Sequence, residues 1–110
     1  MINLTLENFD KEVLSSQRPC IISVKSNQCY LCVELAPIMQ VLQKKYATNF
    51  KFGIVETTEQ LALTDILKIS GVPTIFLFEN GDGYEIVYPE DGYSEEQLTD
   101  CLDTYLINGG

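Results

Sequence analysis

The sequence predicts an α/β fold in the order βαβαβαββα, with a central mixed sheet and helices on both of its faces. Short apolar runs rich in β-branched and aromatic residues alternate with stretches whose apolar residues recur at helical spacing. A turn signal, Asn80-Gly81-Asp82-Gly83, then joins two β-prone runs directly. Alternating strands and helices give parallel strands covered by helices, and the hairpin adds an antiparallel edge.

The first helix is expected near the start of the chain. Thr5 can cap a helix, and Phe9, Val13 and Leu14 then fall on one face of it.

A buried strand and a long helix follow. Residues 20–24 are almost entirely apolar, which is typical of a parallel strand covered on both faces. The next helix starts at a pair of cysteines, Cys29 and Cys32, and Pro37 inside it should kink it because proline donates no backbone hydrogen bond. Its apolar stripe consists of Leu31, Leu35, Ile38, Met39, Leu42 and Tyr46.

The second half of the chain is expected to hold three strands and two helices. The expected strands are residues 50–55, 74–78 and 84–88, and residues 61–69 form the expected helix between the first two. Ser94-Glu95-Glu96-Gln97 is a capping signature for a last helix. The apolar stripe of that helix consists of Leu98, Leu102, Tyr105 and Leu106.

Length and composition are those of one globular domain, which we expect to span residues 1–110. The chain has 110 residues, 45% of them apolar, and contains no repeat or linker. It has no apolar stretch of the length of a membrane span and no basic, apolar leader at its start. We therefore expect a cytoplasmic protein that does not enter a membrane.

The charge is strongly negative and unevenly distributed. The net charge is −9, and beyond Lys68 there are nine acidic residues, from Glu79 to Asp103, and no basic ones. Such a surface repels phosphate, so nucleic-acid binding is not expected. The acidic surface can serve solubility alone, or it can attract basic partners over long range.

The cysteines carry the chemistry that the sequence suggests. A Cys-x-x-Cys pair between a strand and a helix is typical of redox chemistry, because a helix N-terminus stabilises the reactive thiolate. The alternative is a zinc site. Because the chain has no histidine, zinc would need Cys20 and Cys101 as further ligands. Cys101 falls in the apolar stripe of the last helix, and we expect both cysteines to be buried and inert.

Four motifs in order resemble the thioredoxin family over nearly the whole chain. Pro37 follows the cysteine pair by five residues, Gly71-Val72-Pro73-Thr74 resembles the loop of the family's cis-proline, Phe78-Glu79-Asn80-Gly81 resembles its hairpin turn, and Gly92 matches a glycine beside its substrate groove. The resemblance implies a thioredoxin fold and a thiol–disulfide oxidoreductase, by default a protein-disulfide reductase.

The resemblance also implies roles for individual residues. Cys29 would be the exposed nucleophile and Cys32 the less exposed resolving thiol. The implied substrate-binding residues are Tyr30, Leu31, Val72, Pro73 and Gly92. No bound cofactor or metal is implied. The implied partners are protein disulfides and a reductase or another dithiol protein as electron donor, and we expect a monomer.

The surroundings of the cysteine pair depart from the family. Gln28 and Lys25 stand where thioredoxin has tryptophans, and Ser23 stands where it buries an aspartate that moves the proton of the resolving thiol. A hydroxyl cannot act as a base near neutral pH, whereas the Lys25 ammonium could stabilise a thiolate. These losses leave open a second function, a thioredoxin-fold binding module with weak or vestigial redox activity.

Overall fold

Five strands form one mixed sheet in the spatial order β1-β3-β2-β4-β5. The computed structural model describes residues 1–108. Its strands are β1 (Ile2–Asn3), β2 (Cys20–Lys25), β3 (Lys51–Glu56), β4 (Thr74–Glu79) and β5 (Asp82–Ile86). β1, β3 and β2 are parallel, whereas β4 is antiparallel to both β2 and β5. The predicted element order and mixed sheet are confirmed.

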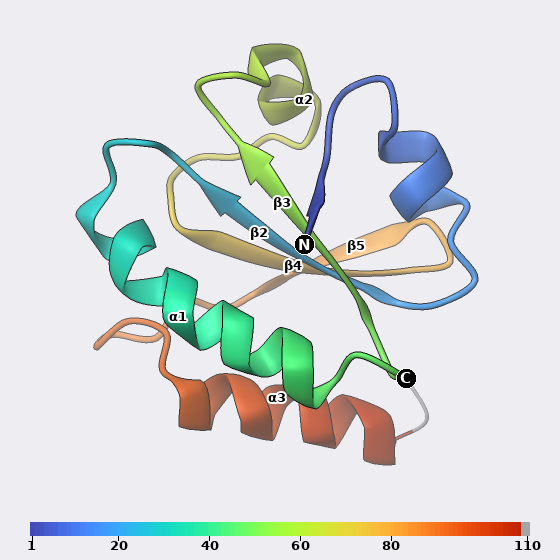
Figure 1. Cartoon of the computed structure of the whole chain (residues 1–110), viewed down its shortest axis with the longest axis vertical. Coiled ribbons are helices and arrows are strands. Elements are labelled where there is room, and N and C mark those ends of the chain that lie inside the picture. The colour runs from blue at the N-terminus through green and yellow to red at the C-terminus, as the bar shows by residue number, and fades with distance from the viewer. Residues whose placement is uncertain (109–110) are drawn as a thin grey trace.

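Helices cover both faces of this sheet (Figure 1). The helices are η1 (Asp10–Leu14), α1 (Tyr30–Lys45), α2 (Leu61–Ile66) and α3 (Glu95–Ile107). α1 and α3 lie along one face, and η1 and α2 cover the other (Figure 1). In the described part of the chain, no helix has the length and apolar character needed to cross a membrane.

The alternation of side chains along β2 determines what each face receives. Ile21 packs in the apolar cluster under α1 and α3, whereas Ile22 and Val24 pack in the cluster under η1 and α2. By the same alternation, Ser23 and Lys25 face α1. The strand therefore carries two polar side chains to the helix that starts at the cysteine pair.

Two expectations about helices were wrong in detail. Leu14 is 40% exposed although Phe9 and Val13 are buried. The reason is that η1 has wide turns, with the N–H of Ser15 donating to the carbonyl oxygen of Asp10, so its fifth residue leaves the buried face.

The third helix is also shorter than expected. α2 ends at Ile66 rather than at residue 69, because Lys68 adopts a left-handed backbone conformation with φ of 56°. The last helix begins as its capping signature predicts, since the Ser94 hydroxyl accepts a hydrogen bond of 3.1 Å from the N–H of Gln97.

The hairpin turn is tighter than expected. Asn80 and Gly81, with φ of 54° and 85°, form the whole loop, and Glu79 pairs with Asp82 across it. β5 therefore starts at Asp82 and ends at Ile86, so the expected strand over residues 84–88 is shifted toward the turn.

Candidate active site

Cys29 and Cys32 are joined in a disulfide at the start of α1. Their Cα atoms lie 5.1 Å apart, within the usual range for a disulfide. Cys29 occupies the N-cap position, and its Sγ accepts a hydrogen bond of 3.1 Å from the backbone N–H of Cys32. An anionic sulfur at this position would be stabilised by that N–H and by the helix dipole.

The two cysteines differ in exposure. Cys29 is partly exposed, whereas Cys32 is 6% exposed and faces the interior. A macromolecular disulfide can therefore approach the sulfur of Cys29 but not that of Cys32.

The two residues between the cysteines are exposed. Tyr30 is 74% and Leu31 47% exposed. The pKa of Tyr30 is raised above its ordinary value, first by a hydrogen bond with Glu34 and then by the charge of that carboxylate. Glu34 therefore lies against the cysteine motif, one turn along α1.

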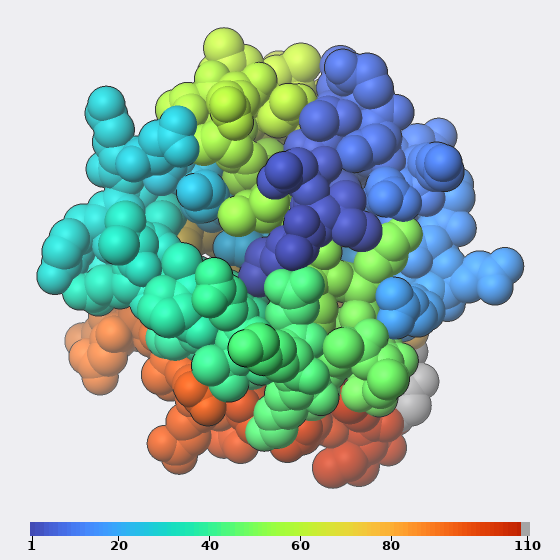
Figure 2. Space-filling view, viewed as in Figure 1, coloured from blue at the N-terminus to red at the C-terminus, as the bar shows by residue number. Residues whose placement is uncertain are grey.

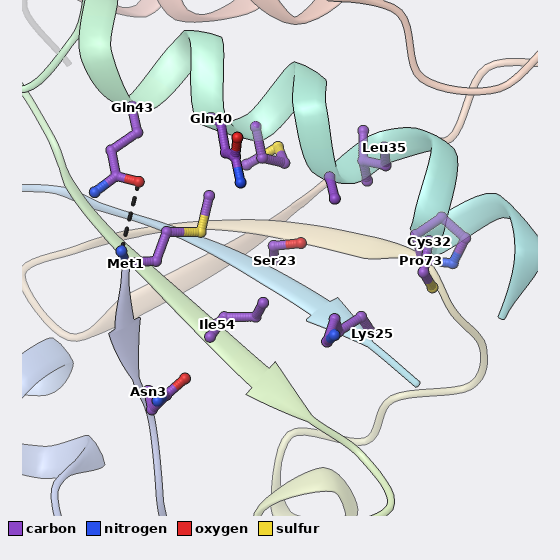
Figure 3. A pocket seen from close by; sticks show the side chains of 12 residues that line it. Met1, Asn3, Ser23, Lys25, Cys32, Leu35, Gln40, Gln43, Ile54 and Pro73 are labelled. Carbon is purple, nitrogen blue, oxygen red and sulfur yellow. Dashed lines mark hydrogen bonds between the residues drawn. The ribbon is translucent and has the colours of Figure 1, made fainter. Parts of the chain in front are cut away.

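Pro73 lies beside the disulfide, and its peptide bond with Val72 is cis. Cys32 and this proline line the same cavity (Figure 3). Val72 is half-buried and packs with the cluster under η1 and α2. Gly92 lies on the other side of Pro73, in a turn closed by its N–H, which donates to the carbonyl oxygen of Pro89 at 2.9 Å.

A cavity of about 260 Å³, the inner cavity, lies behind the disulfide. Cys32, Ser23 and Lys25 line it together (Figure 3). Its other polar side chains are Asn3, Gln40 and Gln43. Figure 2 shows the surface hollowed between α1 and the N-terminal segment, where this cavity lies. Its size and polar lining suit water molecules.

A second depression of about 160 Å³, the outer groove, lies on the other side of Pro73. Leu31, Leu35 and Ile38 of α1 form one wall, and Tyr88, Gly92 and Tyr93 form the opposite wall. Each wall also carries one exposed carboxylate, Glu34 on α1 and Asp91 before Gly92.

Comparison with known proteins agrees with this geometry. The family model for thioredoxin matches residues 1–104. Thioredoxin from Buchnera aphidicola subsp. Schizaphis graminum is 32% identical over 94% of this chain and 94% of its own length.

The chain belongs to the thioredoxin family.

Further relatives extend the similarity. Thioredoxin M5, chloroplastic, from Oryza sativa subsp. japonica is 30% identical over 91% of this chain and 57% of its own length. Thioredoxin from Acidithiobacillus ferridurans is 28% identical over 91% of each chain.

Family membership establishes the class of reaction. The protein is a thiol–disulfide oxidoreductase of the thioredoxin family. Membership also implies protein disulfides as substrates in general and a reductase as the electron-donating partner.

The other two cysteines lie far from the disulfide and from each other. Cys20 is buried in the cluster under η1 and α2, and Cys101 packs against the cluster on the opposite face of the sheet. Four cysteines so placed cannot converge on one zinc ion, so the zinc hypothesis was wrong. Cys101 is also less buried than expected, although burial still raises the pKa of its thiol.

The structure brings together most of the residues expected at the site. Cys29 and Cys32 form the disulfide, and Leu31, Pro73 and Gly92 line the outer groove. Tyr30 and Val72 line neither the groove nor the inner cavity. Sequence reasoning missed the walls of both spaces, namely Glu34, Gln40, Gln43, Tyr88 and Tyr93.

Proposed function

We propose that this thioredoxin-family protein reduces protein disulfides, with Cys29 attacking and Cys32 resolving. The observation that carries this assignment is the position of Cys29, a partly exposed residue whose sulfur accepts a hydrogen bond from an N–H of the first turn of α1. Cys32 lies behind it and is buried.

The reaction takes two exchange steps. The thiolate of Cys29 attacks one sulfur of the substrate disulfide, forms a mixed disulfide and releases the other substrate sulfur as a thiol. Cys32 then loses its proton and attacks Cys29, which releases the second substrate thiol and forms the Cys29–Cys32 disulfide. Two electrons and two protons pass to the substrate, and a reductase or another dithiol protein returns them.

The substrate chain would lie across the surface beside the disulfide. Tyr30 and Leu31 offer exposed side chains next to the nucleophile, and Pro73 and Gly92 border the outer groove. The backbone of Val72 would pair with the substrate as a short additional strand.

The resolving proton needs a route that does not depend on a carboxylate. Cys32 shares the inner cavity with Ser23 and Lys25, and the cavity has room for water. We propose that the proton of Cys32 leaves through this water, with Lys25 stabilising the thiolate that remains.

The remaining properties follow the sequence expectations. We propose one domain over residues 1–110 that acts as a monomer in the cytoplasm and carries no bound cofactor. The nine acidic residues after Lys68 repel phosphate, so we propose no nucleic-acid partner.

An insulin-reduction assay with dithiothreitol tests the assignment. Cys29→Ser should abolish the protein-dependent rate. Reduced Cys32→Ser, mixed with insulin after dithiothreitol has been removed, should accumulate a mixed disulfide that is visible by mass spectrometry. Cys101→Ser is the matched control, because it removes a thiol outside the site and should retain the rate. A rate that does not change in Cys29→Ser would instead support the binding module with vestigial redox activity.

A further inference from the structure

The outer groove has apolar residues in both walls and charges of one sign. Its apolar residues come from α1 and from the segment between β5 and α3. Among the residues that the structure describes, its charged residues are Glu34 and Asp91, and no lysine or arginine lines it. A chain that entered the groove would therefore meet a carboxylate on each side.

The two carboxylates line the same groove from different elements. Glu34 lies one turn of α1 beyond Tyr30, the residue that follows the nucleophile, and its carboxylate raises the pKa of Tyr30. Asp91 lies next to Gly92, at the groove wall opposite α1. Lys25 lines the inner cavity and not the groove.

The wall formed by the segment after β5 is held in place. The hydroxyl of Tyr93 donates to the carbonyl oxygen of Ile86 at 2.7 Å and accepts from the N–H of Ile75 at 3.3 Å. The rings of Tyr88 and Tyr93 pack edge to face, with centroids 4.9 Å apart. Asp91 therefore extends from a wall that is anchored to two strands of the sheet.

We propose that the outer groove selects protein disulfides whose reacting cysteine is flanked by lysine or arginine. This inference rests on the proposed reductase function. The apolar parts of the substrate segment contact the apolar residues of the two walls, and its basic side chains lie against Glu34 and Asp91. The further acidic residues of the C-terminal half add long-range attraction for the same substrates.

Charge complementarity of this kind acts mainly on association. Steering by a one-signed cleft raises on-rates by about tenfold or more, and salt screens it over about 10 Å at 0.1 M. We therefore expect the preference in kcat/KM at low salt, and we expect it to shrink as salt is added.

Three peptide disulfides test the proposal. Each is a homodimer of one cysteine peptide with an apolar segment, flanked by lysine, glutamine or glutamate, and carries a self-quenched fluorophore that brightens on reduction. A basic neighbour also makes a disulfide intrinsically more reactive, so each enzymatic rate is divided by the rate with dithiothreitol alone. After this correction, we expect the lysine peptide to react about tenfold faster than the glutamate peptide.

Matched variants locate the effect. Glu34→Gln with Asp91→Asn should reduce the lysine-to-glutamate ratio by about threefold or more. Glu59→Gln with Asp65→Asn removes the same charge from exposed positions in and beside α2, and it should leave the ratio near the wild-type value. An equal loss in both variants, or corrected rates that are equal for all three peptides, would overturn the inference. Failure to reduce even the glutamine peptide would overturn the reductase function instead.

Discussion

Replacing Ser23 with aspartate would place a carboxyl group in the inner cavity under Cys32. Ser23 is only 6% exposed, so the charged form of the new side chain would lose most of its hydration. Burial of this kind raises a carboxyl pKa by up to 3–5 units. A rise of about three units, from about 3.9 to about 7, corresponds to about 4 kcal/mol of unfolding free energy.

The sign of the pH dependence follows from the raised pKa. Between about pH 4 and pH 7 the folded protein would hold a proton that the unfolded chain releases, so stability would fall as pH rises through this window. Below pH 4 the penalty would be absent, and above pH 7 it would be complete. Urea unfolding at pH 5 and pH 8 measures this loss of unfolding free energy. Ser23→Asn is the uncharged control of similar shape.

The same variant should accelerate resolution. A carboxylate in reach of the Cys32 proton is a general base, and such bases contribute about 10²–10⁴-fold where no other route exists. Because cavity water already offers the proton a route, we expect the rate constant for release of the second substrate thiol to rise by only about tenfold. Stopped-flow measurements above pH 7 test this. The release of the first thiol should change little.

Two results would contradict this reasoning. A loss of stability that is the same at pH 5 and pH 8, and also seen in Ser23→Asn, would mean that only the shape of the cavity matters. The second result is a Ser23→Asp variant whose stability depends on pH as expected but which releases the second substrate thiol at the wild-type rate. It would mean that the Cys32 proton does not leave through the inner cavity.

Three further changes test other parts of the fold and site. Lys25→Met keeps the apolar stem but removes the charge from the inner cavity, and should raise the pKa of the reactive thiols, measured by alkylation rate against pH. Lys44→Met is its exposed control, and an unchanged thiol pKa in Lys25→Met would refute the role of that ammonium. Gly92→Ala forces a side chain onto a residue with φ of 87°, and should cost about 1 kcal/mol of unfolding free energy and lower kcat/KM for peptide disulfides. Leu98→Ala empties a site in α3 that is 1% exposed and should cost about 2–5 kcal/mol in urea unfolding, whereas Leu106→Ala, at 36% exposed, should cost much less.

The strands and long helices were predictable because their signals are local. The continuous apolar run of β2 and the helical stripe of α1 each appear in a single window of sequence. β1 has only two residues and forms by parallel pairing with β3, about fifty residues away, so no local pattern marks its bounds. The end of α2 depends on one left-handed residue, Lys68, of a type that rarely adopts that conformation.

The site was predictable only where it is a motif. The cysteine pair and the proline loop could be found because their spacing is distinctive. Glu34 and Asp91 are separated by 57 positions in the sequence. They line one groove only because the segment between β5 and α3 lies opposite α1 in the fold. The inner cavity is likewise lined by Gln40 and Gln43 of α1 together with residues of three strands. These residues are too far apart in the sequence for a local pattern to reveal the cavity.

The inner cavity and the outer groove thus affect different steps of the reaction. Pro73 and Leu35 border both the inner cavity and the outer groove, while the groups that carry charge are separate: Lys25 in the cavity, Glu34 and Asp91 in the groove. A change in the cavity acts on the proton of Cys32 after the substrate is bound, whereas a change in the groove acts on which substrate binds. Ser23→Asp should therefore accelerate resolution by the same factor for basic and acidic peptides. A factor that differs between them would mean that recognition and proton transfer are coupled through the residues that the two spaces share.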